Sequence, residues 1–420
     1  MDGIRHAPLE HSIYYCLADI LMEEKRYQDA IDTVRNIPGT GGARVKPLTI
    51  LGHCSFSLGH SAEAENYAAA LSALPGGRAA SLYLLGLLCL KKGERHEAGD
   101  HFLKAMEIDG NLAGPRVHLG VLRWQNGDHA AAFDLIEEGF ARSPETEDFS
   151  ATYRSAVSSL GELDRAGQVL LEVLRLHPEN RKLTFLHIGV LLENGKHAEA
   201  MTAIEKAIAA FGVTDEMLAA ALAVRETLGP LVIAKGENEP QTLSVCMIVK
   251  NEEEHIARCL ASLTPIADEI IVVDTGSTDR TVDIARVFGA TIFDLPWTDD
   301  FSEARYFSLE KARGDWILVH DADEVISPLD HGRLRLIADA KPPRPVAYQL
   351  TTRNYITEPA TDGWTPNDGI YDEEEAGNGW FPSAKVRLFT NDRRIRFANP
   401  VHEVLEPSIN EATARLLTRH

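Results

Sequence analysis

An alanine recurs every 34 residues through the first half of this 420-residue chain. The six positions are Ala30, Ala64, Ala98, Ala132, Ala166 and Ala200. Twelve residues before these alanines lies a second position, which is small in the first four copies: Ala18, Gly52, Gly86 and Gly120. Small residues at a fixed spacing are typical of two helices that cross closely, since a larger side chain would force them apart. The period therefore predicts about six stacked helical hairpins.

Each copy has two amphipathic stretches separated by a short polar turn, and residues 81–111 form the clearest copy. This pattern resembles the tetratricopeptide repeat. The resemblance implies a stack that binds an extended peptide or a protein partner. A structural spacer, or a homodimer formed through an end repeat, is the alternative. We expect residues 213–230 to form a capping helix and residues 1–235 to form the all-α repeat domain.

The chain carries a formal net charge of −21, which disfavours nucleic acid and anionic membranes as partners. No apolar run approaches the length of a membrane span, and the first residues have no apolar segment typical of a secretory signal. Five scattered cysteines without a Cys-x-x-Cys pair indicate buried thiols in a reducing compartment. These features together predict a cytoplasmic protein without an integral membrane segment.

A polar linker at residues 236–241 separates the repeats from a second domain at residues 242–420. Short apolar runs there alternate with amphipathic stretches. The runs predict strands at 243–249, 269–273, 291–293 and 316–319. The stretches between them predict helices at 251–263, 278–288, where Ser277 is the candidate N-cap, and 301–312. This alternation is typical of an α/β domain with a mostly parallel sheet that helices cover on both faces.

Acidic loops follow three of the predicted strands, at residues 250–252, 274–279 and 320–324. The carboxyl ends of parallel strands meet at one edge of a sheet, which is where ligands bind in such folds. Carboxylates that converge there repel each other, and a divalent cation shared with a diphosphate would relieve the repulsion. Neither a Gly-x-Gly-x-x-Gly nor a P-loop motif follows the first strand, which disfavours nicotinamide-dependent redox enzymes and P-loop nucleotidases.

Three segments together resemble family 2 glycosyltransferases of the GT-A (Rossmann-like) fold: residues 245–263, 268–285 and 301–324. Four later segments are similar to a subgroup of that family, at residues 353–355, 379–382, 385–389 and 400–403. That subgroup includes lipopolysaccharide-core transferases and the peptide S-glycosyltransferases that combine this domain with tetratricopeptide repeats. The resemblance implies an inverting, metal-dependent hexosyltransferase that uses a nucleotide-sugar, with a UDP-sugar as the family-level expectation and Mn²⁺ or Mg²⁺ as the metal.

The resemblance also assigns roles to single residues. Those expected to bind the nucleotide-sugar are Val249, Lys250, Asn251, Glu252, Asp274, Arg305, Asp321, Ala322 and Trp380. Asp274 would contact the base or ribose, and Asp321, the first acid of the Asp-x-Asp motif, would contact the ribose. Arg305 could instead form a surface salt bridge with Glu303 or Glu310. Trp380, with Trp364, could instead be a packing residue.

The resemblance places the metal on Asp323, with His402 near the metal or diphosphate. Glu403 is the first candidate for the catalytic base, because a single displacement needs a group that takes the acceptor proton. Asp372 and the acidic run at residues 373–375 are the rival, and a solvated loop is the alternative for that run. We expect Asp321→Ala or Asp323→Ala to abolish turnover without unfolding the protein.

Three functions remain open at this point. The first is a transferase that modifies a protein or peptide acceptor presented by the repeats. The second is a transferase that modifies a glycan or lipopolysaccharide-type acceptor, with the repeats serving assembly. The third is a non-catalytic repeat scaffold with a decayed transferase domain, which the intact acidic motifs disfavour.

Overall fold

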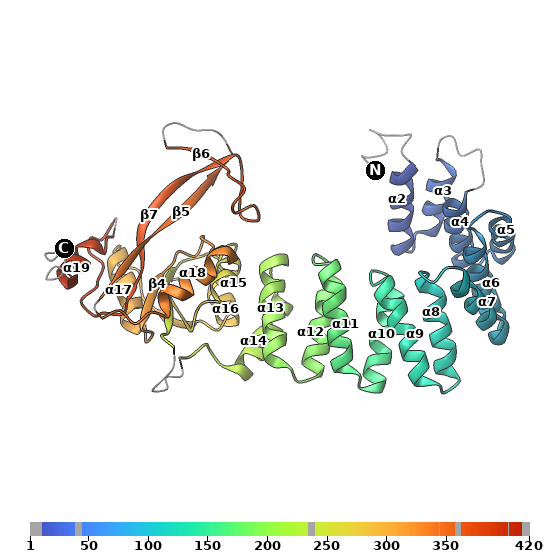
Figure 1. The fold of residues 1–420 in the computed structure, drawn as a ribbon, viewed down its shortest axis with the longest axis horizontal. Coiled ribbons are helices and arrows are strands. Elements are labelled where there is room, and N and C mark those ends of the chain that lie inside the picture. The colour runs from blue at the N-terminus through green and yellow to red at the C-terminus, as the bar shows by residue number, and fades with distance from the viewer. Residues whose placement is uncertain are drawn as a thin grey trace. The chain divides into compact units, whose positions relative to one another are not determined.

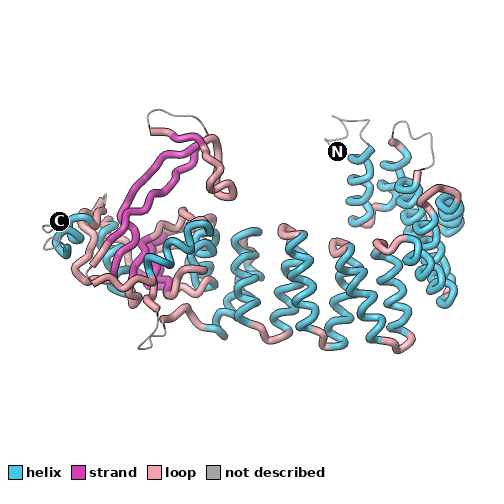
Figure 2. The backbone as a smooth tube through the Cα atoms, in the orientation of Figure 1, coloured by secondary structure: helices cyan, strands magenta, loops and turns pink. Residues whose placement is uncertain are grey.

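The computed structural model describes residues 11–37, 44–233, 240–343, 345–357, 363–401 and 403–413. The chain divides into two compact units, Met1–Asn194 and Gly195–His420. Helices alone make up the described part of the first unit, whereas the second combines helices with a sheet (Figure 1 and Figure 2). The predicted fold class, a tetratricopeptide-repeat solenoid followed by an α/β domain with a mostly parallel sheet, is confirmed.

The first unit is a series of helices that pack as successive hairpins, α2 on α3, α4 on α5, α6 on α7 and α8 on α9. The helices of this unit are α2 (His11–Glu23), α3 (Tyr27–Arg35), α4 (Val45–Ser57), α5 (Ser61–Ser72), α6 (Arg78–Lys92), α7 (Arg95–Ile108), α8 (Ala113–Gln125), α9 (His129–Arg142), α10 (Glu147–Leu160), α11 (Leu163–Leu176) and α12 (Arg181–Glu193). Each hairpin also contacts the next, from α3 on α4 to α9 on α10, so each hairpin buries apolar surface against its neighbour.

The periodic small residues lie where the helices cross. All six of the alanines at the 34-residue spacing are fully buried. At Gly86 an added Cβ would lie 2.4 Å from the Phe102 ring, and at Gly120 it would lie 2.9 Å from the Ala132 carbonyl oxygen. Real Cβ atoms do not approach other atoms this closely, so the hairpins can close only around small residues. The predicted physical basis of the repeat is confirmed.

The cysteines only partly match the expectation of buried thiols. Cys54, Cys246 and Cys259 are buried, but Cys16 is exposed and Cys89 is partly exposed. The expectation is wrong for Cys16, and it holds only in part for Cys89, which packs at the edge of a hydrophobic cluster of the repeats.

The second unit begins with two more helices and continues into the α/β domain. Its helices are α13 (His197–Phe211), α14 (Asp215–Leu228), α15 (Ile256–Leu263), α16 (Thr281–Val287), α17 (Phe301–Lys311), α18 (Pro328–Ala338) and α19 (Glu406–Thr413). Its strands are β1 (Leu243–Val249), β2 (Glu269–Asp274), β3 (Thr291–Asp294), β4 (Trp316–Val319), β5 (Ala347–Ile356), β6 (Thr365–Pro366) and β7 (Gly379–Thr390). Helix α14 occupies the segment predicted as the capping helix. The predicted linker at 236–241 is untested, since residues 234–239 lie outside the described residues.

The strand order in the sheet is β3-β2-β1-β4-β7-β5, with β6 beside β7. The first four strands are parallel, as the sequence predicts. Strand β7 joins β4 in the antiparallel direction and pairs along its full length with β5. This long β5–β7 ribbon, drawn in orange-red in Figure 1, begins in the sheet at the Ala347–Phe389 pair and extends beyond it to the Ile356–Gly379 pair.

Helices cover the parallel strands on both faces. The connections β1-α15-β2 and β2-α16-β3 run in one direction across the sheet, and β3-α17-β4 returns in the other. Because such connections are right-handed, α15 and α16 share one face and α17 covers the opposite one. Helix α17 packs on β1 and β2, while α13 packs on α15 and α14 packs on α16.

Two predicted helix boundaries are wrong for the same reason. Helix α15 begins at Ile256 rather than at residue 251, and α16 begins at Thr281 rather than at residue 278. Asn251 adopts a left-handed conformation, with φ of 56°, which a right-handed helix does not allow. Ser277 does not cap a helix, because its hydroxyl oxygen accepts the Asn251 backbone N–H at 3.0 Å. The loops after β1 and β2 fold against each other, so neither begins a helix.

Candidate functional site

The candidate site lies where the direction of the sheet reverses. The chain leaves β1 toward β2 and β3, then returns to place β4 on the other side of β1. Ligands of open α/β sheets bind at the carboxyl ends of the strands that flank such a point. Val249 at the end of β1 pairs with Asp274 at the end of β2, and Val319 ends the neighbouring strand β4. The three predicted acidic loops therefore start from one edge of the sheet.

Hydrogen bonds join the loops that follow β1 and β2. The Asn251 side-chain oxygen accepts the Thr278 backbone N–H at 2.8 Å, and the Glu252 N–H donates to the Thr281 hydroxyl at 2.7 Å. The buried Asp274 carboxylate accepts the backbone N–H of Ser277 at 3.1 Å. Lys250 is exposed beside them. Of the predicted nucleotide-binding residues, the structure thus brings Asn251, Glu252 and Asp274 into one connected surface.

Two buried arginines hold Asp321, the first acid of the Asp-x-Asp motif. Arg305 Nη2 donates to one carboxylate oxygen at 2.7 Å, and Arg387 Nη2 donates to the other at 2.9 Å. Only 9% of Arg305 and 5% of Arg387 is exposed. Although burial alone would raise it, the pKa of Asp321 lies well below its usual range, since two cations stabilise the charged form. Two arginines therefore balance the negative charge of Asp321 in this structure.

Arg305 links the motif to the candidate base. Its Nε donates to Glu403 Oε1 at 2.7 Å while its Nη2 holds Asp321. The predicted alternative, a surface salt bridge with Glu303 or Glu310, is wrong, because Arg305 projects from α17 into the interior and pairs with Asp321 and Glu403 instead. Glu403 thus joins the site across almost a hundred residues of sequence.

Sequence reasoning missed Arg387 as a site residue. It lies on β7, whose Leu388 pairs with Leu318 of β4, and it also donates to Glu324 at 2.8 Å. The segment 385–389 was recognised as part of the family resemblance, but a basic residue in a strand carries no signal of its partner. Only the pairing of β4 with β7 brings this guanidinium beneath Asp321.

Asp323, the second acid of the motif, is in a different environment from Asp321. Its side chain is exposed and has no hydrogen-bond or ion-pair partner among the residues that the structure describes. Its negative charge, after burial, raises the pKa of Glu252 across the site. Ala322 between the two acids is buried. An unpaired carboxylate next to another acidic side chain has the hard oxygen ligands that Mg²⁺ and Mn²⁺ prefer.

The buried His320 side chain contacts the backbone of the Asp-x-Asp motif. Its Nδ1 lies 2.9 Å from the Asp321 carbonyl oxygen, and 5% of the residue is exposed. Burial and the nearby Arg387 lower the pKa of His320 to about 4. The imidazole is therefore neutral near pH 7, and because a carbonyl only accepts, its proton lies on Nδ1. This hydrogen bond fixes the backbone that carries Asp321.

A cavity of about 470 Å³ adjoins this charge network. Phe301, Phe397 and Leu405 contribute apolar walls, and Arg305, Arg387 and Glu403 contribute the polar ones. Arg305 Nη1 is buried there without a partner in the described part of the chain. The space beside Glu403 combines apolar walls with charged side chains, which is typical of a site for an organic ligand. His402 lies outside the described residues.

Trp380 lies in a separate cluster on the β5–β7 ribbon. The Arg353 guanidinium stacks on the Trp380 ring at 4.4 Å and on the Tyr371 ring at 4.5 Å. Trp380 is seven residues along β7 from Arg387, which is about 23 Å of extended strand. The structure brings Trp380 to Arg353 rather than to the charge network, and its predicted contact with the nucleotide-sugar is untested.

Asp372, the rival base, is exposed in the segment between β6 and β7. The hydroxyl of the preceding residue, Tyr371, donates to Asp330 of α18 at 2.9 Å, so this segment reaches the helix that follows the Asp-x-Asp motif. The acidic run is only partly a solvated loop, because Glu375 Oε1 accepts the Gly369 backbone N–H at 3.0 Å. Asp372 therefore stays a candidate base only because its segment lies near the helix that follows the motif.

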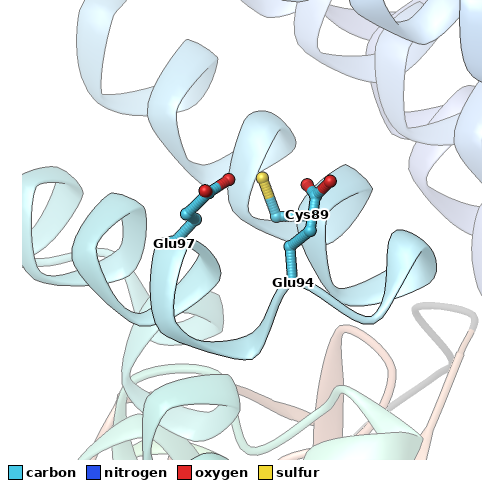
Figure 3. Close-up of side chains that lie close together, drawn as sticks. All are labelled: Cys89, Glu94 and Glu97. Atoms are coloured by element: carbon cyan, nitrogen blue, oxygen red, sulfur yellow. The ribbon is translucent and has the colours of Figure 1, made fainter.

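A second acidic cluster lies in the first unit, away from these residues. Figure 3 shows Cys89 at the end of α6 beside Glu94 and Glu97 at the start of α7, with potential ligand atoms within 4.8 Å of one another. Nothing else among the described residues points to an ion there. Partial burial and the hydrogen bond with Glu94 raise the pKa of the Cys89 thiol, which disfavours the thiolate that metals bind.

Comparison with protein families gives matches in both units. Residues 244–391 match Glycosyl transferase family 2, and residues 79–112 and 156–212 match tetratricopeptide repeats. The structure has no helix, within its described ranges, that is both long and apolar enough to cross a bilayer.

Curated relatives carry names that agree with these matches. A TPR repeat-containing protein of Synechococcus elongatus is 39% identical over 168 residues, 40% of this chain and 36% of that protein. An uncharacterized glycosyltransferase of Rickettsia typhi is 39% identical over 109 residues, 26% of this chain and 37% of its own length. Glycosyltransferase SunS of Bacillus subtilis is 29% identical over 181 residues, 41% of this chain and 37% of that protein. The chain thus spans little more than a third of each relative's length.

Solved structures show only a distant likeness. A thermophilic TPR protein of Thermus thermophilus aligns with a TM-score of 0.34 and 17% identity, over 43% of this chain and 98% of that one. Residues 1–349 of TarS from S. aureus align with a TM-score of 0.20 and 25% identity, over 22% of this chain and 32% of that one.

Proposed function

This chain contains a family 2 glycosyltransferase domain and tetratricopeptide repeats, and from that premise we propose that it is a metal-dependent, inverting glycosyltransferase of the cytoplasm. It transfers a sugar from a UDP-sugar to a protein or peptide acceptor that the repeats recruit. The observation that carries the proposal is the network at the end of β4, where Asp321, Arg305 and Glu403 connect the donor-side motif to a candidate base.

The nucleotide occupies the surface formed by the loops after β1 and β2. Asn251 and Asp274 line that surface, which their hydrogen bonds to the neighbouring loop preform. A ligand then binds without first ordering the chain, which lowers the entropic cost of binding. Asp321 faces the ribose: each carboxylate oxygen offers two acceptor sites, so hydrogen bonds from two arginines leave room for a ribose hydroxyl.

Asp323 holds the metal ion, since it is the acidic side chain of the motif that no arginine neutralises. The bound metal would act as a Lewis acid for the charge on the departing nucleoside diphosphate. Burial raises the pKa of Glu252, and the charge of Asp323 raises it further; a cation would relieve this second effect. His402, the other predicted ligand, remains a proposal from the resemblance alone.

Glu403 is the catalytic base. Arg305 holds its Oε1 and so orients the carboxylate, and its Oε2 takes the proton of the acceptor nucleophile. The nucleophile then displaces the nucleoside diphosphate from the sugar in one step, with inversion at the anomeric carbon. The cavity beside Glu403 offers the acceptor group the apolar walls of Phe301, Phe397 and Leu405.

Calorimetric titration of the full chain with UDP, GDP and ADP, each with and without Mn²⁺, tests the proposal. We expect the wild type to bind UDP only when Mn²⁺ is present. The Asp323→Ala variant should lose this metal-dependent binding. Arg286→Ala, a change on an exposed ion pair of α16, is the matched control and should bind as the wild type does. Binding of no nucleotide by folded protein would instead favour a non-catalytic scaffold.

The acceptor class needs a separate experiment. Incubation with UDP-[¹⁴C]glucose or UDP-N-acetyl-[¹⁴C]glucosamine and a peptide library, read by radiolabel transfer, should label peptides. Label that appears only on glycan or lipopolysaccharide fractions would contradict the peptide acceptor and leave the donor site intact.

A further inference from the structure

The hairpin formed by α13 and α14 contacts the loop that follows β2, which is part of the predicted nucleotide site. The turn between α13 and α14 lies against the start of α16. Arg280, directly before that helix, donates from Nη1 to the Val213 carbonyl oxygen at 3.0 Å. The same nitrogen lies 3.4 Å from the Asp215 carboxylate, which is mostly exposed. One arginine of the α/β domain thus binds the turn of a repeat-like hairpin.

Arg280 also holds the loop that follows β1. Its backbone N–H and its Nε both donate to Glu253 Oε2, at 3.0 and 3.1 Å. The Glu253 backbone N–H returns the contact by donating to Asp279 at 3.2 Å. Because Arg280 uses Nε toward Glu253 and Nη1 toward Val213, it bridges the loop and the α13–α14 turn with a single planar group.

The backbone N–H groups at residues 251–253 of this loop bond outside it, while the Glu252 carbonyl oxygen accepts the backbone N–H groups of His255 and Ile256 at 3.0 and 2.9 Å. The backbone N–H groups of Asn251, Glu252 and Glu253 all donate to side chains of the segment 277–281, and none of the three donates to another backbone group of the loop. Asn251 has a left-handed φ, which costs free energy unless surrounding structure maintains it. The position of the segment 277–281 therefore sets the shape of the loop.

The hairpin fixes the other end of α16 as well. Arg225 of α14 donates from Nε to the Val287 carbonyl oxygen at 2.8 Å, and the Leu231 N–H donates to the Gly289 carbonyl oxygen at 2.9 Å. Arg225 is itself ion-paired with the buried Glu205 of α13. With contacts at both of its ends, the short helix α16 is held against α13 and α14 as well as against the sheet.

We propose that Arg280 is a positioning residue of the donor site, through which the α13–α14 hairpin sets the conformation of residues 251–253 and thereby the affinity for the nucleotide. This inference rests on the proposed function, since it assumes that the loop binds a nucleotide. It assigns the last hairpin a part in donor binding in addition to any part in acceptor recruitment. Arg280 itself touches no substrate in this scheme.

Two measurements on the full chain test the proposal. The first is amide hydrogen exchange of residues 250–254 without nucleotide, and the second is the calorimetric Kd for UDP with Mn²⁺. Arg280→Ala should speed exchange at these amides and weaken UDP binding by about three- to tenfold, because charge-assisted hydrogen bonds to a partly exposed group are lost. Exchange rates and UDP affinity in Arg280→Lys should lie between those of the wild type and of Arg280→Ala, since a lysine cannot bridge Glu253 and Val213 together.

A variant on the hairpin separates its contribution from that of the Arg280–Glu253 pair. Asp215→Lys places a cation beside Arg280 at an exposed position, so it should speed exchange at residues 250–254 and weaken UDP binding about twofold. The control is Arg286→Ala, which removes only a pair within α16. It should leave both readouts unchanged.

Unchanged exchange and unchanged Kd in Arg280→Ala would overturn the inference, and so would changes of equal size in Arg286→Ala. If Arg280→Ala does not fold, Arg280→Lys and Asp215→Lys provide the test instead. Exchange at the wild-type rate in both variants would overturn the inference. If the wild type binds no nucleotide, the proposed function fails. The exchange data then still decide whether the hairpin controls the loop.

Discussion

The two units differ in what their buried residues require of their surroundings. In the repeats the fully buried positions that recur are alanines, and glycines at the second position leave no room for a methyl group. In the α/β domain the edge of the sheet buries Arg305 and Arg387, whose charges are balanced by carboxylates of the same network. The repeats therefore depend on volume at each helix crossing, and the candidate site depends on charge.

This difference predicts which substitutions each unit tolerates. A change of charge without change of volume should affect the candidate site more than the helix crossings where the periodic small residues lie. An added methyl group should do the reverse at the helix crossings. The contrast arises because van der Waals contacts fall off within an ångström, whereas an unpaired charge in a poorly solvated site is costly wherever it lies.

The largest effect is expected on turnover. Glu403→Gln keeps the shape of the side chain but cannot take a proton, so kcat should fall by about a thousandfold while the Kd for UDP changes little. Steady-state kinetics and calorimetry on the same preparation measure the two quantities. Asp372→Asn is the matched comparison at the rival carboxylate. A larger loss of kcat in Asp372→Asn than in Glu403→Gln would move the base to the segment between β6 and β7.

The next effect is on stability. Asp321→Ala leaves two buried guanidinium groups without their shared partner, which should destabilise the α/β domain by about 3 kcal/mol. The sequence predicts that this variant loses turnover without unfolding, and the arginine network adds that its stability should nevertheless fall. Asp323→Ala removes an exposed carboxylate that has no partner among the described residues. Its free energy of unfolding should lie within about 0.5 kcal/mol of that of the wild type. Chemical denaturation measures both, and equal stability of the two variants would contradict the arginine network.

A pH effect of similar or smaller size is expected from His320. The unfolded chain protonates this imidazole near its ordinary pKa of 6.5, but the folded domain does so only near pH 4. Protons therefore favour the unfolded state between these values, and stability should fall by up to about 3 kcal/mol as the pH drops from 6.5 to 4. His320→Asn keeps a donor for the Asp321 carbonyl and should flatten this part of the curve. An unchanged slope in the variant would assign the pH dependence to other groups.

The smallest effect tests volume in the repeats. Gly120→Ala places a Cβ 2.7 Å from Ile136 and 2.9 Å from the Ala132 carbonyl oxygen, so it should destabilise the repeats by about 2 kcal/mol. Gly167→Ala is the control in α11, where a Cβ meets nothing within 4 Å and the gain in helix propensity should stabilise by about 0.5 kcal/mol. Thermal unfolding measures both. UDP affinity should stay unchanged in each, and equal stabilities would refute the packing argument.

Much of the fold was predictable because it depends on local periodicity. The alanine spacing predicts the helix crossings, and the apolar runs predict β1 to β4 within a residue at each end. The start of α15 was not predictable, because it depends on hydrogen bonds between Asn251 and residues 277 and 278, on another strand's loop. The antiparallel addition of β7 beside β4 had no signal in the order of the elements.

The sequence by itself determined the two unit types, the four parallel strands and the acidic loops at their carboxyl ends, since each follows from residues near one another in the chain. Only the tertiary structure decided the partners of those loops. Arg387 reaches Asp321 across 66 residues, Arg305 reaches Glu403 across 98, and Arg280 reaches Val213 across 67. A long, flexible arginine side chain does not reveal its partner in sequence, because the choice is made by which strands and helices the fold brings within a few ångströms.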